Sequence, residues 1–127
     1  MGIIAFWFVI LDGPMSLPDP PLLVFSTAPD EEVARSLAQD LVEEGLAACV
    51  TALPGASSTY SWQGRMETSS EVQLLIKTCR SRLAELEQRL CALHPFEVPE
   101  LLAVEVVGGL PTYLDWVRAS VGGDPSP

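Results

Sequence analysis

Apolar and polar positions divide the first part of the chain into a strand and a helix. Residues 22–26 form a short apolar run without alternation, as expected for a strand that is buried on both faces. Apolar residues then recur at helical spacing over 33–42, after the start signals of the sequence TAPD at 27–30. Gly45 follows, so we predict a helix that ends there.

The middle of the chain favours extended structure. We predict strands at 46–53 and 71–78, with further extended structure at 57–62, a break at Pro54-Gly55 and a turn at 63–65. The strand at 71–78 alternates well, and most of its apolar residues point to one face. Leu75 is the exception on the other face. Its presence there indicates that the second face is also partly covered, for example by another subunit.

Leucines at +3, +4 and +3 spacing predict a second helix over 81–93. We expect Glu85 and Arg89 to form an ion pair on its outer surface, because residues four apart are neighbours on a helix. The segment HPFEVPE at 94–100 ends this helix, since the residue before a proline avoids the helical region.

A hydrophobic strand at 101–107 and a short helix at 111–121 complete the order β-α-β-β-α-β with a trailing helix. This order predicts an α+β fold of the ferredoxin-like type, in which two helices cover one face of an antiparallel sheet. The strands carry apolar residues on both faces, so we expect an oligomer that covers the second face. We place the domain at 21–121, with an extension at 1–20 and a flexible tail at 122–127.

Composition excludes several classes of function. The 127 residues fit one domain, and 48% of them are hydrophobic, which is enough for a core. The formal net charge is −10 and Lys and Arg do not cluster, so we expect no nucleic-acid partner. The apolar run at 3–11 is too short to span a bilayer as a helix, so no membrane partner is expected. Three cysteines without a C-x-x-C motif favour a reducing, cytoplasmic location.

The segment 94–100 holds the candidate metal chemistry, because it contains the only histidine of the chain together with two glutamates. In a polyproline-like segment, His94, Glu97 and Glu100 share one face, with neighbours roughly 9 Å apart at a rise of about 3.1 Å per residue. Two such side chains can converge on one ion but three hardly can, so a site here is open, weak or shared between subunits. Such a site favours Cu²⁺ over other divalent ions. The alternative is that His94 caps the helix end near its negative dipole.

Catalysis is not indicated. No sequence feature places a serine or cysteine beside His94, and no nucleophile elbow is present. Neither a P-loop nor a G-x-G-x-x-G motif is found, so we predict no enzyme and no obligatory cofactor. Lys77, at the end of an apolar strand, either extends its ammonium to water or pairs with an acid such as Glu71, Glu97 or Glu100.

Taken together, these segments resemble the CutA family of divalent-cation tolerance proteins over residues 22–120. The resemblance rests on TAPD at 27–30, GLAACV at 45–50, STYSWQG at 58–64, IKT at 76–78, HPFEVPE at 94–100 and YLDW at 113–116. It implies a tight homotrimer similar in build to the PII signalling proteins, and an association with tolerance to copper and other divalent metals. It also implies a cleft between subunits, near Trp62, Glu71, Lys77, His94, Phe96, Glu97, Glu100, Tyr113 and Trp116.

Three positions depart from the pattern of relatives that bind metal. Ser26 stands where some carry a cysteine, Leu93 precedes His94 where some carry a second histidine, and Phe96 replaces the usual tyrosine. We therefore expect a trimeric tolerance protein that binds divalent cations, Cu²⁺ most tightly, weakly at the cleft. His94 is the expected first ligand, assisted by Glu97 or Glu100. The alternative is a PII-like regulatory or scaffold trimer whose cleft binds a small molecule or a protein.

Overall fold

The computed structural model describes residues 18–122 and confirms the predicted order of elements. The elements are β1 (Pro21–Ala28), α2 (Glu31–Glu43), β2 (Cys49–Trp62), β3 (Arg65–Cys79), the 3₁₀ turn η1 (Arg80–Arg82), α3 (Leu83–Leu93), β4 (Leu102–Glu105) and α4 (Pro111–Val121). Within these residues no helix is long and apolar enough to cross a bilayer. Most of the predicted extension and of the predicted tail lies outside the described residues.

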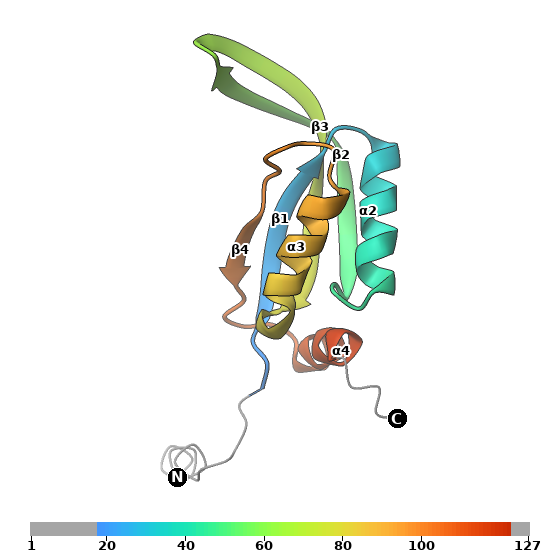
Figure 1. The fold of residues 1–127 in the computed structure, drawn as a ribbon. Helices are drawn as coiled ribbons and strands as arrows, with labels where there is room; N and C mark the ends of the chain where they lie inside the picture. Colours follow the sequence, from blue (N-terminus) through green and yellow to red (C-terminus); the bar gives the residue numbers. More distant parts are fainter. Residues whose placement is uncertain (1–17, 123–127) are drawn as a thin grey trace, which may run out of the picture.

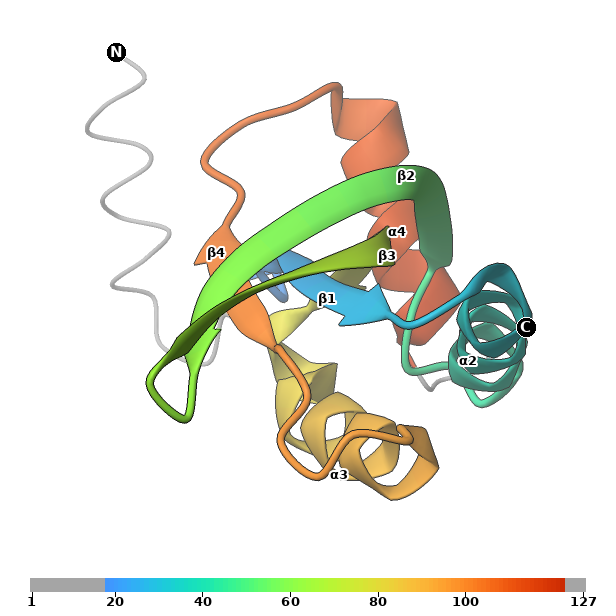
Figure 2. The ribbon, with the colours of Figure 1, turned by 90° about the horizontal axis from the view of Figure 1, so that it is seen from above.

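The four strands form one antiparallel sheet in the order β2-β3-β1-β4, and α2 and α3 cover one of its faces (Figure 1). Seen from above, α4 lies toward the other side of the sheet (Figure 2). The main core fills the space between the sheet and the two covering helices, where leucines of α2 and α3 meet Leu74 and Ile76 of β3. The fold is therefore mixed α+β, as predicted.

The chain covers the two faces of this sheet unequally. In β1, Leu22 and Val24 are buried in the core under the helices, whereas Leu23 and Phe25 are only half-buried. Successive residues of a strand point to opposite faces, so Leu23 and Phe25 belong to the second face. Leu75 of β3 pairs with Phe25 and is also half-buried. The position predicted for Leu75, on a second apolar face, is thus confirmed.

Strands β2 and β3 form a long hairpin whose outer part, residues 56–71, projects beyond the sheet as an arm (Figure 1). Its turn is built by Gln63 and Gly64, whose φ angles of 52° and 80° are the two left-handed positions of a type I′ turn. The predicted strand end at Pro54-Gly55 is wrong, because β2 continues through a bulge between Leu53 and Ala56. A bulge lets the strand leave proline out of the ladder and resume pairing.

Helix α2 begins and ends at residues that satisfy its free backbone groups. Asp30 caps its start, where the carboxylate accepts a hydrogen bond of 2.9 Å from the N–H of Val33. After its end, Gly45 takes a φ of +72°, and the N–H of Leu46 bonds back to the carbonyl of Leu41. This is the Schellman arrangement, which confirms Gly45 as the helix stop.

Helix α3 begins at Leu83, after the 3₁₀ turn, rather than at residue 81. The predicted ion pair between Glu85 and Arg89 is wrong. Arg89 instead bonds both carboxylate oxygens of Glu44, and Glu85 pairs with Arg82. A planar guanidinium fits two carboxylate oxygens at once, and Glu44 offers that geometry just after the end of α2.

The last strand is shorter than the predicted 101–107. Among residues 18–122, strand β4 pairs only with β1, at the edge of the sheet, and all four of its residues are exposed. Just after β4, the N–H of Val106 bonds to the carbonyl of Pro21, which is the first residue of β1. The ladder therefore ends because β1 offers no partner beyond this point.

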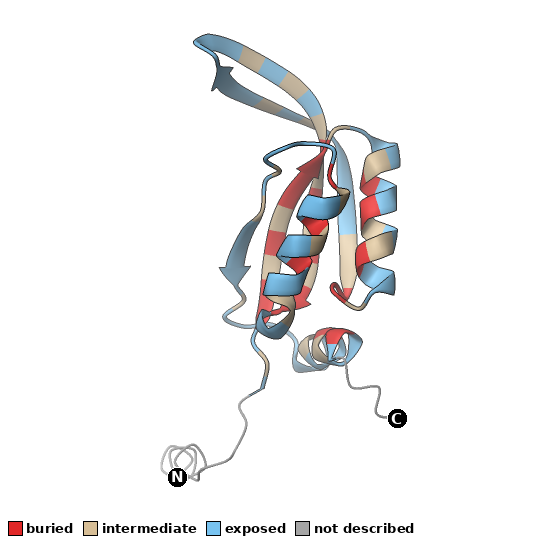
Figure 3. Cartoon of the chain, viewed as in Figure 1, coloured by how far each residue is buried: buried red, intermediate tan, exposed pale blue. Residues whose placement is uncertain are grey.

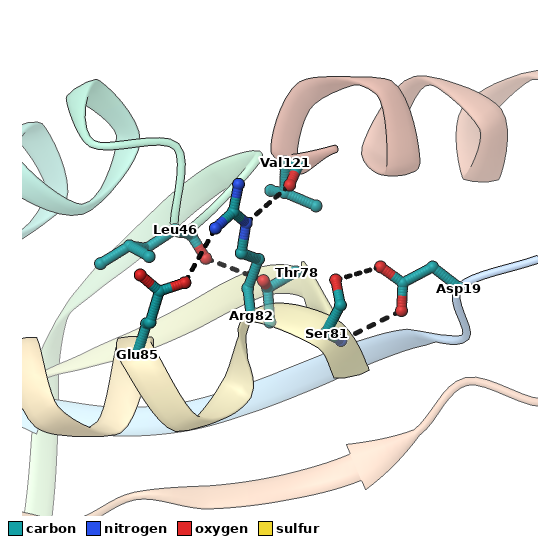
Figure 4. A network of polar contacts seen from close by, with 7 residues as sticks. All are labelled: Asp19, Leu46, Thr78, Ser81, Arg82, Glu85 and Val121. Carbon is teal, nitrogen blue, oxygen red and sulfur yellow. Dashed lines mark hydrogen bonds and ion pairs between the residues drawn. The ribbon is translucent and has the colours of Figure 1, made fainter. Parts of the chain in front are cut away.

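Polar contacts tie the two ends of the described chain to the start of α3 (Figure 4). Asp19 accepts hydrogen bonds from the backbone N–H and the hydroxyl of Ser81. Arg82 donates a hydrogen bond of 2.8 Å to the carbonyl oxygen of Val121 in α4. Asp19, which lies within the predicted extension, is therefore bonded to the turn that precedes α3.

A second, smaller core lies between the sheet and α4 and consists of Ala48, Cys79, Val117 and Val121. Cys79 is fully buried there, and all three cysteines are free thiols. Burial, assisted by the negative charge of Asp19 and opposed by Arg118, raises the pKa of the Cys79 thiol to about 11. The thiol therefore keeps its proton well above neutral pH.

We predict that Cys79 makes the free energy of unfolding fall between about pH 9 and about pH 11. In this range the unfolded thiol, with its ordinary pKa of 9.0, releases its proton while the folded thiol keeps it. The folded state then binds more protons, so a rise in pH favours unfolding. Urea denaturation across this range should show a smaller decline for Cys79→Ala than for the wild type. Cys91→Ala, which removes an exposed thiol, is the control, and equal declines in all three proteins would contradict the assignment.

Candidate functional site

The segment 94–100 is held to the end of β1 by two hydrogen bonds. His94 follows α3 with an extended backbone, as predicted, and its Nε2 lies 2.7 Å from the carbonyl oxygen of Thr27. At the other end of the segment, the Ser26 hydroxyl donates a hydrogen bond of 2.8 Å to the carbonyl oxygen of Glu100. Two adjacent residues of β1 therefore fix both ends of the segment.

Both ring nitrogens of His94 are engaged within the chain. The N–H of Phe96 donates to Nδ1 at 3.1 Å, so Nδ1 is the acceptor and Nε2 carries the proton that is donated to Thr27. His94 is only 7% exposed, and its ring packs against the Phe96 ring with the centroids 4.8 Å apart. In this arrangement His94 presents no free lone pair to a metal ion, and it acts as a structural corner.

The two glutamates of the segment are exposed and form no ion pair among the described residues. The chain bends at residues 95–98, so it does not follow the straight polyproline path on which the predicted spacing depends. Over residues 18–122, no group of three His, Cys, Asp or Glu side chains is placed to hold a metal ion. The segment therefore offers the carboxylates of Glu97 and Glu100 as donors, beside a histidine that is already bonded.

The residues that the resemblance assigns to one cleft lie in different parts of a single chain. Glu71 lies at the base of the arm, and Lys77 follows six residues later on β3, which is roughly 20 Å at about 3.3 Å per residue. Glu71 follows the register of Val72 with Ala28, at the end of β1 that holds the segment 94–100. Lys77 pairs with Cys49, which contacts Tyr113 of α4 at the other end of the sheet. One chain alone therefore does not bring these residues into one site.

The arm carries polar and aromatic side chains and adds nothing to the main core. Glu71 accepts a hydrogen bond of 2.6 Å from the Ser58 hydroxyl, and Tyr60 bonds to Ser69 across the strands. Trp62, beside the turn, is 60% exposed. The arm of this chain therefore leaves its large side chains open to contact.

Near α4, Lys77 lies on the face that the helices α2 and α3 leave uncovered. Its ammonium donates a hydrogen bond of 2.8 Å to the Thr51 hydroxyl of the neighbouring strand β2. No carboxylate among the described residues lies within ion-pair distance of it. The hydrogen bond to Thr51 matches neither predicted alternative, and the predicted acidic partner is not found among residues 18–122.

Tyr113 reaches from α4 to strand β2. Its hydroxyl lies 3.7 Å from Sγ of Cys49, the residue that pairs with Lys77 across the strands. The pKa of Tyr113 is raised above its ordinary value, mainly by the hydrogen bond with Cys49 and to a smaller extent by partial burial. The Tyr113 and Trp116 rings lie 5.7 Å apart, and both remain partly exposed. An ammonium, two hydroxyls, a thiol and two rings therefore gather at one end of the uncovered face.

The other half of the uncovered face is apolar. The register places Leu23 beside Val104 and Phe25 beside Leu102. Leu102 and Val104 of β4 are 62% and 47% exposed, and Figure 3 shows the whole strand as exposed. A contiguous apolar surface of this kind is typical of a protein–protein contact.

Four residues that make these contacts were not identified as such from the sequence, namely Ser26, Thr27, Cys49 and Thr51. Ser26 was noted only as the residue that stands in place of a metal-binding cysteine, whereas its hydroxyl bonds the carbonyl oxygen of Glu100. Cys49 and Thr51 lie two positions apart on β2, so they point to the same face, and the pairing of Cys49 with Lys77 puts Lys77 on that face too. The alternation of β2 would have indicated that Cys49 and Thr51 share a face. The contact between Thr27 and His94 joins residues 67 positions apart, and no local pattern predicts it.

Ser26→Ala should lower the free energy of unfolding by about 1–2 kcal/mol, because the carbonyl of Glu100 loses its donor in a partly buried place. Ser70→Ala, which removes an exposed hydroxyl from the arm, is the matched control and should change stability much less. Urea denaturation of both variants measures the difference. A loss no larger for Ser26→Ala than for Ser70→Ala would show that this hydroxyl does not hold the segment.

Comparisons with known proteins point to a single family. The family described as CutA1 divalent ion tolerance protein matches residues 22–120. The divalent-cation tolerance protein CutA of Thermus thermophilus is 47% identical over 100 residues, which are 79% of this chain and 97% of that protein. The Arabidopsis thaliana protein CutA, chloroplastic, is 41% identical over 101 residues, which are 80% of this chain and 56% of that protein.

A solved structure agrees with these sequence matches. The crystal structure of CutA from Xylella fastidiosa is 52% identical in sequence and superposes with a TM-score of 0.79. The match covers 80% of this chain and 98% of that one. The fold, the motifs and the extent of these matches agree, and the chain belongs to the CutA1 family of divalent ion tolerance proteins.

Proposed function

We propose that this protein confers tolerance to divalent cations as a homotrimer of ferredoxin-like subunits, and that it binds these cations weakly at the cleft between subunits. Membership of the CutA1 family is the observation that carries the proposal. Divalent-cation tolerance is the function named for the Thermus thermophilus relative. Cu²⁺ is the divalent ion that binds most tightly, because imidazole and carboxylate donors follow the Irving–Williams order.

Three features of the single chain support an assembly. The uncovered face exposes Leu102 and Val104. Strand β2 forms the other edge of the sheet, and such an edge leaves backbone groups unpaired. The arm is a two-stranded ribbon, which is marginally stable in water by itself. In the proposed trimer, the faces cover one another and the arm of one subunit approaches the α4 end of the next.

The proposed cation site uses the exposed carboxylates of Glu97 and Glu100. His94 becomes a ligand only when its Nδ1 gives up the hydrogen bond from the N–H of Phe96. This competition between a metal ion and a backbone donor keeps the site weak. The lack of a second histidine at Leu93 and of a cysteine at Ser26 acts in the same direction.

A cytoplasmic location is part of the proposal. All three cysteines are free thiols, and Cys91 is exposed on α3. Exposed free thiols persist in a reducing compartment, whereas oxidising compartments favour disulfides.

A second candidate function is that of a PII-like regulatory or scaffold trimer. Lys77 favours it, because this ammonium lies among the proposed cleft residues and has no acidic partner in the described part of its own chain. An ammonium repels metal cations and suits an anionic or polar ligand. The two functions differ in the sign of the charge that the cleft receives.

The trimer predicts a mass in solution of roughly three times the chain mass of 13.7 kDa, measured by light scattering at micromolar concentration. Val104→Lys, which places a charge on the uncovered face, should lower this mass, because a buried unpaired charge opposes association. Val42→Lys is the matched control, since Val42 is similarly exposed but lies on α2. A wild-type mass of one chain would overturn the proposed assembly.

Calorimetric titration with Cu²⁺ tests the cation site. We expect His94→Ala and the double variant Glu97→Gln/Glu100→Gln each to weaken binding by about tenfold or more, because each removes donors from the metal. Glu87→Gln, which neutralises an exposed carboxylate on α3, should leave the isotherm unchanged. Circular dichroism confirms that each variant is folded. Isotherms that match the wild type for both site variants would exclude the segment 94–100.

A further inference from the structure

Lys77 is the only lysine of the chain, and it is half-buried on a central strand of the sheet. Its cross-strand neighbours are Cys49 on β2 and Leu23 on β1. Its ammonium has three N–H groups, and among the described residues one of them bonds, to the Thr51 hydroxyl. A single neutral acceptor compensates little of the positive charge of a half-buried ammonium. Removing water from such a charge therefore costs free energy.

The other basic residues at this end of the fold are already paired. Arg80 pairs with Glu105, Arg82 with Glu85, and Arg118 with Asp115. The chain has 17 acidic residues against 7 basic ones, so carboxylates are not scarce. Within residues 18–122, the fold nevertheless places none of them at Lys77.

The groups around Lys77 are those that bind a small anion. The hydroxyls of Thr51 and Tyr113 can donate to an oxyanion, and Cys49 links the two by its contact with Tyr113 and its pairing with Lys77. The Tyr113 and Trp116 rings provide a partly exposed apolar wall beside these donors. A few polar groups next to aromatic side chains are the usual lining of a small-molecule site.

The uncovered face is divided between two kinds of surface. Its β1 and β4 half carries Leu23, Phe25, Leu102 and Val104 and suits contact with another subunit. The half near β2 and α4 carries the ammonium of Lys77 from β3, the hydroxyls and the partly exposed rings. The polar half is therefore the part of the face that remains suited to a ligand when the apolar half is covered.

We propose that Lys77 binds the carboxylate or phosphate group of a small molecule in the cleft, beside Thr51 and Tyr113. The inference rests on the proposed homotrimer, because a second subunit over the face withdraws Lys77 from water and strengthens its attraction for an anion. The charge is recognised by the ammonium and oriented by the hydroxyls, while the rings contact the uncharged part of the molecule. The competing occupant is a carboxylate of a second copy of the chain.

Calorimetric melting of the full chain, with inorganic phosphate or succinate added at constant ionic strength, tests this site. We expect at least one of the two anions to raise the Tm of the wild type in a concentration-dependent way, because a ligand of the folded state stabilises it. Lys77→Met keeps the apolar stem and should weaken the apparent affinity by about tenfold or more. Arg35→Met, which removes an exposed positive charge on α2, should keep the full response.

Light scattering on the same samples separates the possible failures. An unchanged response in Lys77→Met, or no response of the wild type to either anion, would overturn the anion site. A wild type without response, combined with a smaller assembly for Lys77→Met, would assign Lys77 to a carboxylate of a second copy. A single-chain mass with a Lys77-dependent response would reject the trimer and place the anion on the uncovered face of one chain instead of in a cleft.

Discussion

The structure depends on one constraint: its four-stranded sheet has two apolar faces, and helices α2 and α3 cover one of them. Helices α2 and α3 bury the alternate residues Leu22 and Val24, while their neighbours Leu23 and Phe25 are left half-buried. Neighbouring residues of a strand point to opposite faces. The register that buries Leu22 and Val24 under the helices therefore also places Leu23 and Phe25 on the second face. The single chain therefore combines an apolar face outside the cover of α2 and α3 with an open sheet edge at β2 and a projecting arm.

The segment 94–100 illustrates how this frame limits chemistry. Its residue types suggest a metal site, yet its first and last residues are bonded to Thr27 and Ser26 at the end of β1. The hydroxyl of Ser26 and the ring of His94 hold the return from α3 to the edge strand β4. A side chain that holds the fold in this way reaches a metal ion only by releasing a bond, so stability and metal affinity compete at His94.

The sequence was sufficient for the features that depend on neighbouring residues. Gly45 and the turn at Gln63 and Gly64 were predicted because a left-handed backbone is a local requirement that glycine meets. The bulge after Leu53 was missed, because a proline and a glycine signal a strand end as readily as an interruption within a long strand. The partner of Arg89 was also missed, since Glu44 lies 45 positions away and only the packing of the two helices brings them together.

The cleft was predicted only by resemblance, because local sequence patterns do not show which distant residues come together. Within one chain, Glu71 and Lys77 lie roughly 20 Å apart along β3, and strand geometry forbids any closer approach. In the proposed trimer, the end of one subunit that carries Glu71 approaches the end of the next that carries Lys77. The proposed arrangement sets the acidic segment with Glu97 and Glu100 opposite a neighbour's Lys77, which has no acidic partner among residues 18–122 of its own chain. A cleft with carboxylates on one wall and an ammonium on the other can hold a cation and an anion side by side, and each ion lowers the electrostatic cost of the other.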